Sequence, residues 1–208
     1  MNEVSAMIEL VLVYLGAIGA ASSYYIFCKL KEISDMTDDV GTELAAWGFM
    51  LMGFGLLIET IVHLIHLYKA VYGVTIVLPS FLYVYGNAFS PLPPALFLVA
   101  YTLYFTGVYV SHRLGSLALT ITPVSVIAIF LGEMNALMLL MLFLAFLYSF
   151  ENKNKKFLTF FSILILSHLV AMAGILDYKM TFVFVRIAFA LRALAPTVLV
   201  YMVIRKKR

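Results

Sequence analysis

Three ionisable side chains share one apolar stretch of this sequence, and their types and spacing could support chemistry. Glu59, His63 and His66 stand in the run Glu-Thr-Ile-Val-His-Leu-Ile-His, so their spacing places them on one face of a helix. A carboxylate with two imidazoles could supply metal ligands or a proton relay. The run lacks the glutamate between histidines that marks the zinc-protease helix. A carboxylate so deep in an apolar segment is nevertheless expected to be paired, protonated or functional.

Further ionisable residues interrupt the last two apolar stretches. His168 stands in Leu-Ser-His-Leu, where it could relay a proton, ligate a metal or hydrogen-bond to a neighbouring helix. Arg186 and Arg192 remain charged, so each must reach an interface or find a partner. Their separation turns them about 120° apart on a helix, so they are not expected to hold one small ligand from the same face.

Depth within the helices selects a partner for Glu59. At a rise of about 1.5 Å per residue, Glu59 lies about 14 Å from the end of its helix, counted from Tyr68. Its depth matches that of Arg192 if this end is cytoplasmic, and that of Arg186 if this end is external. His168 has a similar depth in both cases. The sequence therefore predicts an internal Glu59–Arg pair beside His168, which is either a structural clamp or part of a ligand or ion pathway.

The elements that carry these residues belong to a membrane protein. The chain has 208 residues, of which 64% are hydrophobic and 12% are charged, whereas soluble domains have about 45–50% apolar and about 25% charged residues. This composition excludes a soluble enzyme, a disordered protein and a disulfide scaffold, and the one cysteine, Cys28, allows no internal disulfide. We expect an all-α, polytopic bundle that forms a single transmembrane domain over residues 1–208.

Eight apolar segments are separated by charges, glycines or prolines, with a charged loop at Glu32–Glu43. The predicted helices are Ser5–Phe27, Leu44–Leu67, Val71–Phe89, Pro94–Val110, Ser116–Leu131, Met134–Phe150, Phe157–Leu176 and Met180–Ile204. Val71–Phe89 is the weakest, because it contains Gly73, Pro79, Gly86 and Asn87. It is either a crossing helix or a re-entrant segment, which leaves two topologies.

The distribution of basic residues barely separates eight crossings from seven. Eight crossings put Lys69 in the cytoplasm, whereas seven put Lys29 and Lys31 there and leave the chain's start outside. Both place the C-terminus in the cytoplasm. The absence of any charge across Val71–Phe89 favours eight crossings, with seven as the alternative.

Two basic clusters are interpreted as topogenic charges rather than as a nucleic-acid patch. Lys153, Lys155 and Lys156 form the first, and residues 205–208 form the second. Both neighbour apolar helices, so the expected partner is the lipid bilayer and not nucleic acid. We expect a multi-pass protein of the plasma (cell) membrane.

The favoured function is a small-solute or ion carrier, or a ligand-sensing membrane bundle. Buried ionisable residues are pathway candidates by default. Glu59 would titrate or bind an ion, Arg192 or Arg186 would be its counter-charge, and His168 would act as a relay.

Two alternatives remain open. A membrane enzyme or redox subunit would use His63, His66 and His168 as ligands of zinc or haem. An accessory subunit of a membrane complex, or a homo-oligomer, would fit the lack of any stretch long enough for a soluble domain. The sequence alone does not decide whether the protein is an enzyme.

Overall fold

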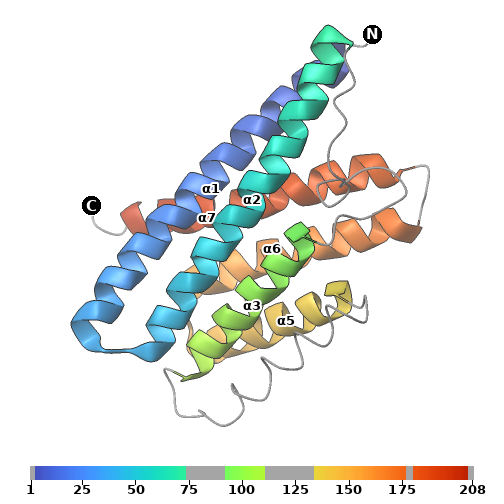
Figure 1. The fold of residues 1–208 in the computed structure, drawn as a ribbon. Coiled ribbons are helices and arrows are strands. Elements are labelled where there is room, and N and C mark those ends of the chain that lie inside the picture. Colours follow the sequence, from blue (N-terminus) through green and yellow to red (C-terminus); the bar gives the residue numbers. More distant parts are fainter. Residues whose placement is uncertain (1–2, 74–91, 111–133, 177–179, 206–208) are drawn as a thin grey trace.

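The computed structural model describes residues 3–73, 92–110, 134–176 and 180–205, and these residues form helices and the short turns between them. Helices α1, α2 and α3 come first along the chain, and α5, α6 and α7 follow (Figure 1). Their bounds are α1 Glu3–Thr37, α2 Val40–Tyr72, α3 Leu92–Val110, α5 Met134–Glu151, α6 Lys155–Leu176 and α7 Thr181–Arg205.

Four of the described helices, α1, α2, α6 and α7, are long and apolar enough to cross a membrane, judged by length and composition. The apolar parts of α3 and α5 are shorter. Many large apolar side chains point away from the bundle, among them Leu57, Leu147 and Leu166. Such a surface suits lipid rather than water. To this extent, the prediction of an all-helical membrane protein is confirmed.

The charged loop predicted at Glu32–Glu43 is largely helical. Helix α1 continues to Thr37, well beyond Phe27, because its charges pair along and across the helices. Lys31 lies 2.8 Å from both Asp35 of its own helix and Glu43 of α2. The chain turns only at Asp38, whose φ of 52° is left-handed. Asp39 then caps α2 by accepting a hydrogen bond from the amide of Gly41 at 3.0 Å.

Contacts between the helices fix their directions. We call the end that holds the α1–α2 turn the turn end, and the other the opposite end. α1 and α2 are antiparallel, joined by this turn. α2 and α3 are also antiparallel, because Gly55 packs on Phe97 while Gly107 packs on Gly41. α1 and α7 run parallel, since Glu9 meets Arg186 and Gly19 meets Ala193.

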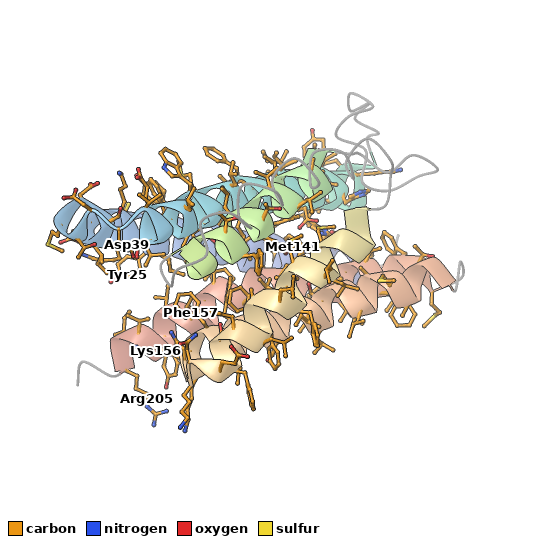
Figure 2. All side chains as sticks on the ribbon, turned by 90° about the horizontal axis from the view of Figure 1, so that it is seen from below. Tyr25, Asp39, Met141, Lys156, Phe157 and Arg205 are labelled. Carbon is orange, nitrogen blue, oxygen red and sulfur yellow. The ribbon has the colours of Figure 1, made fainter. Side chains whose placement is uncertain are left out.

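The same contacts place the helix ends. Helices α1, α3, α5 and α7 begin at the opposite end, whereas α2 and α6 begin at the turn end (Figure 1). The turn at Asn152–Asn154, which joins α5 to α6, therefore lies beside the α1–α2 turn. The last described residue, Arg205, lies at the turn end as well. In Figure 2, Asp39, Lys156 and Arg205 are labelled at this end of the molecule.

The prediction of eight crossings is not supported. Tyr72 ends α2 and Leu92 begins α3 at the same end of the bundle, because these neighbouring helices are antiparallel. Most of the predicted helix Val71–Phe89 and all of Ser116–Leu131 lie outside the described residues. A charge-free stretch is compatible with a crossing but does not require one, so the sequence alone does not decide whether it crosses.

Aromatic side chains dominate the core between α2, α3 and α6. Phe49 contacts Tyr104 and Phe160, with ring centroids 4.7 and 5.2 Å apart. Tyr104 also packs edge-on against Phe161. These four residues form a layer, which we call the aromatic layer, and all are almost fully buried. This layer lies between the turn end and the polar residues described next.

Candidate functional site

A buried ion pair joins α2 to α7. Arg192 donates from Nη2 to Oε1 of Glu59 at 2.9 Å. Glu59 is 6% exposed and Arg192 is 8% exposed, so neither charge is solvated by bulk water. The guanidinium carbon of Arg192 also lies 5.0 Å from the centroid of the Phe97 ring, which favours the cation. The internal pair expected from the sequence is present with Arg192 and not with Arg186.

Helix length explains this choice of arginine. The sequence argument ended the second helix near Tyr68, but α2 continues to Tyr72. Counted from the opposite end, Glu59 is then about 20 Å deep and Arg192 about 17 Å deep, whereas Arg186 is only about 8 Å deep. The extra turn of α2 therefore moves Glu59 to the depth of Arg192. The match of Glu59 with Arg186, expected for seven crossings, is wrong for this reason.

Arg186 has a different partner, which the sequence analysis missed. Its Nη2 donates to Oε1 of Glu9 on α1, and Glu9 Oε2 lies 2.7 Å from Nδ1 of His63 on α2. Glu9 and His63 are both 2% exposed. Glu9 stands inside the predicted segment Ser5–Phe27, so the signal that singled out Glu59 was also present here. Like Glu59, a carboxylate at this position is expected to be paired, protonated or functional.

His168 completes the deeper cluster. Its Nε2 lies 3.1 Å from the hydroxyl oxygen of Tyr101 on α3, and the two rings pack edge to face. Tyr101 in turn stacks on Phe97, the ring beneath Arg192. Ring contacts therefore connect His168 to the Glu59–Arg192 pair. We call the set of Glu59, Arg192, Phe97, Tyr101 and His168 the deep polar site. Glu9, His63 and Arg186 form the shallow polar site.

Several buried polar atoms of these two sites have no hydrogen-bond partner among the described residues. In the deep polar site they are Oε2 of Glu59, Nε of Arg192 and Nδ1 of His168, and in the shallow polar site Nε of Arg186. Buried polar atoms are usually satisfied, because each unmade hydrogen bond costs free energy. Free acceptors and donors beside a buried ion pair can engage a proton, an ion or a small polar solute.

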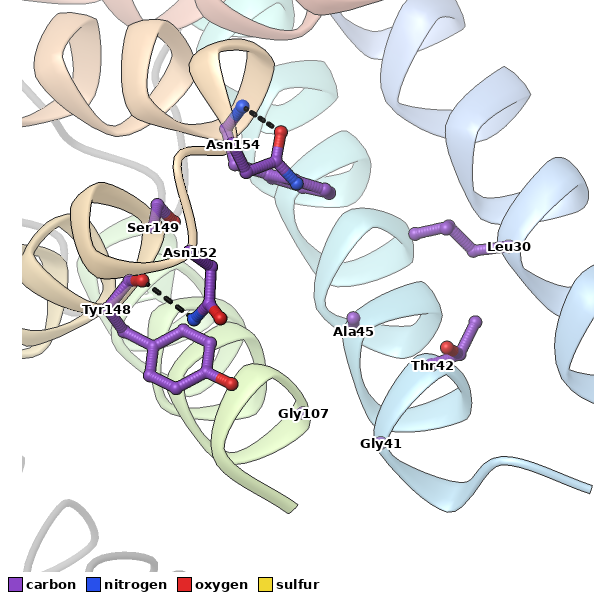
Figure 3. A pocket seen from close by; sticks show the side chains of 10 residues that line it. Leu30, Gly41, Thr42, Ala45, Gly107, Tyr148, Ser149, Asn152 and Asn154 are labelled. Carbon is purple, nitrogen blue, oxygen red and sulfur yellow. Dashed lines mark hydrogen bonds between the residues drawn. The ribbon is translucent and has the colours of Figure 1, made fainter. Parts of the chain in front are cut away.

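A pocket of about 190 Å³ opens at the turn end (Figure 3). Small residues, Gly41, Ala45 and Gly107, make space for it, and Thr42, Asn152 and Asn154 add polar groups. Figure 3 shows the side chains of Asn152 and Asn154 near its rim, each in a local hydrogen bond. Along α2, α3 and α6 the order is the same: this pocket, the aromatic layer, then the deep polar site.

The three histidines predicted as metal ligands are not brought together. His63 bonds to Glu9, whereas His168 bonds to Tyr101 on the other side of the bundle. His66 is half-buried one turn beyond His63 on α2. Within the described helices, no group of three or more His, Cys, Asp or Glu side chains has an arrangement that could hold a metal ion. The zinc or haem hypothesis stays a prediction from the sequence.

No protein-family model, curated protein or solved structure matches this chain. The chemistry of the site can therefore be inferred only from its own side chains. Two carboxylates, each bound by an arginine, lie among apolar helices together with two buried imidazoles. Such groups can exchange protons, release a counter-charge to a competing ion, or hydrogen-bond a polar solute.

Proposed function

We propose that this protein is a small-solute or ion carrier of the cell membrane whose working site is the deep polar site. The observation that carries the proposal is the buried Glu59–Arg192 pair with unpartnered atoms on both side chains. A structural clamp would gain most from saturating its hydrogen bonds. Atoms left available beside a buried charge pair suit a group that binds and releases an ion, a proton or a solute.

The directions of the helices support seven crossings rather than eight. Helix α1 begins at the opposite end and α7 ends at the turn end, so the described part of the chain starts and finishes at different ends of the bundle. These positions fit an odd number of crossings and not an even one. The chain then starts on one side of the membrane and finishes on the other.

The basic residues orient this arrangement. Most basic residues lie at the turn end, namely Lys29, Lys31, Arg205 and the cluster at residues 153–156. Among the lysines of the described residues, only Lys69 lies at the opposite end. By the positive-inside rule, the turn end faces the cytoplasm. The pocket of Figure 3 then opens to the cytoplasm, and both polar sites lie in the outer half of the bundle.

A carrier of this design would work by moving the aromatic layer. This layer separates the cytoplasmic pocket from the deep polar site, so solute passage requires its rings to separate. Pro196 gives α7 a point of bending one turn after Arg192, because proline cannot donate a hydrogen bond to the carbonyl of Arg192. Binding at Glu59 would weaken its pair with Arg192 and free α7 to bend.

Flux through reconstituted vesicles tests the proposal. Purified protein is placed in liposomes, and uptake of protons, Na⁺, K⁺ and a panel of amino acids, sugars and monocarboxylates is compared with empty vesicles. We expect at least one of these to pass faster with the wild-type protein. Glu59→Gln should reduce that flux by roughly two orders of magnitude, because it removes the titrating charge and the counter-charge of Arg192.

The matched control is Glu32→Gln, which removes a carboxylate from an exposed pair with Lys29 outside the deep polar site. Its flux should equal that of the wild type. Transport that survives in Glu59→Gln would contradict the assignment of the site, and vesicles no more permeable than empty ones would contradict a carrier. A solute that raises the melting temperature without being moved would instead favour a ligand-sensing bundle.

A further inference from the structure

A second pocket at the turn end is lined by basic side chains. It has a volume of about 550 Å³ and lies between the start of α6 and the end of α7. Lys153, Lys155 and Lys156 line it from the α5–α6 turn and the first turn of α6, and Arg205 and Tyr201 line it from α7. We call this pocket the basic groove. It takes no part in the proposed carrier site, which lies beyond the aromatic layer.

The cations of the basic groove have no acidic partner among the described residues. The other lysines at this end are neutralised: Lys29 lies 2.6 Å from Glu32, and Lys31 lies 2.8 Å from Asp35 and from Glu43. None of the ion pairs in the described helices involves the groove. Four like charges around one hollow repel each other, and an anion between them would relieve that repulsion.

The walls of the groove point to a ligand at the membrane interface. Tyr201 is 60% exposed and Met202 adds an apolar wall, while Ile204 continues an exposed apolar surface on α7. Exposed tyrosines beside lysines are typical of the headgroup region. The groove also includes the first turn of α6, where the helix dipole favours an anion. Lys156 and Arg205 lie at the same end of the molecule in Figure 2.

We propose that the basic groove binds the phosphate headgroup of an anionic phospholipid in the cytoplasmic leaflet. The four cations supply the charge for a phosphodiester, and the tyrosine and apolar wall lie where its glycerol and first acyl carbons would run. A free phosphate would use the cations alone and leave this apolar wall unexplained. The inference rests on the groove and on the orientation proposed above from the basic residues, and it is independent of whether the protein carries a solute.

Native mass spectrometry of the full-length protein in detergent tests the proposal, with phosphatidylglycerol and phosphatidylcholine of identical acyl chains as probes. We expect phosphatidylglycerol to be retained preferentially by the wild type. The variant Lys155→Gln/Lys156→Gln should lose on the order of tenfold in affinity for phosphatidylglycerol, because each interfacial cation attracts an anionic lipid. Its affinity for phosphatidylcholine should not change.

The matched control is Lys29→Gln/Lys31→Gln, which removes two positive charges at the same end but outside the groove. It should keep wild-type retention of phosphatidylglycerol, and circular dichroism should show both variants folded. Equal losses in the two variants would overturn the groove as the site. Equal retention of both lipids would overturn anionic selectivity, and stabilisation by inorganic phosphate without lipid retention would identify a free-anion site instead.

Discussion

At the scale of single residues, the buried charges are arranged as two carboxylates that each hold one arginine. Glu9 binds Arg186 near the opposite end, and Glu59 binds Arg192 deeper in the bundle. The arginines lie about 120° apart on α7, so each faces a different helix: α1 for Arg186 and α2 for Arg192. This angular separation, expected from the sequence, is what keeps the two pairs distinct.

A double-mutant cycle should show that Glu59 and Arg192 depend on each other. Arg192→Met removes the cation and leaves a buried carboxylate without its counter-charge, so the variant should be clearly destabilised. Glu59→Gln in the same chain removes that uncompensated charge and should restore much of the stability. We expect a coupling of about 1–3 kcal/mol from thermal unfolding in detergent.

The exposed pair of Lys29 and Glu32 provides the comparison for this cycle. The same cycle with Lys29→Met and Glu32→Gln should give no measurable coupling, because water and salt screen the charges. If the Glu59–Arg192 cycle gave no more coupling than the exposed one, the buried pair would not be an energetic link between α2 and α7.

At the scale of helices, close packing of α1 against its neighbours aligns Glu9 with its partners. A Cβ atom at Gly19 would lie only 2.6 Å from the carbonyl oxygen of Ala193 on α7. That backbone atom cannot move aside as a flexible side chain would. The absence of a side chain at this glycine therefore sets the distance between α1 and α7, and with it the contact of Glu9 with Arg186.

Gly19→Ala should separate α1 from α7 and destabilise the protein by about 1–3 kcal/mol, as overpacking commonly does. The melting temperature in detergent measures this effect. Gly53→Ala is the control, because a Cβ there would be 3.4 Å from the nearest atom, a side-chain carbon of Ser23. That variant should melt at or above the wild-type temperature, since alanine favours a helix over glycine. Equal melting of the two variants would contradict close α1–α7 packing.

At the scale of the whole molecule, the number of crossings has a direct test. Eight crossings place Tyr72 and Asn152 on the same side of the membrane, whereas seven place them on opposite sides. Both residues are exposed at helix ends. In a Cys28→Ser background, Tyr72→Cys and Asn152→Cys are labelled in intact cells with a membrane-impermeant maleimide. We expect labelling at Tyr72→Cys and none at Asn152→Cys until the cells are opened.

The same experiment contains its own check. Both cysteines must react fully after the cells are opened, which shows that each site is reachable by the reagent. Labelling of neither cysteine in intact cells would favour eight crossings, because it would place Tyr72 on the cytoplasmic side together with Asn152. Protection of Tyr72→Cys alone would contradict the assignment of the turn end to the cytoplasm.

Much of the architecture was predictable because local signals dominate it. An apolar stretch in lipid must form a helix, since no water is available to satisfy its backbone. Glu59 and Arg192 were visible as charges in such stretches, and they are paired in the structure. Glu9 gave the same signal but lies close to the start of its segment, where a carboxylate is also compatible with a wet helix end. Its buried pair with Arg186 and His63 therefore went unpredicted.

The sequence by itself determined the chemical class of this protein: apolar helices interrupted by a few ionisable residues that need partners. The tertiary structure alone decided which partners meet. The depth of a residue in the bundle depends on where its helix ends. Because α2 extends to Tyr72, Glu59 lies at the depth of Arg192 rather than of Arg186. The antiparallel packing of α2 on α3 likewise decided at which end of the bundle α3 begins. Hydropathy reports whether a residue prefers lipid, but depth and direction follow from packing between helices distant in the chain.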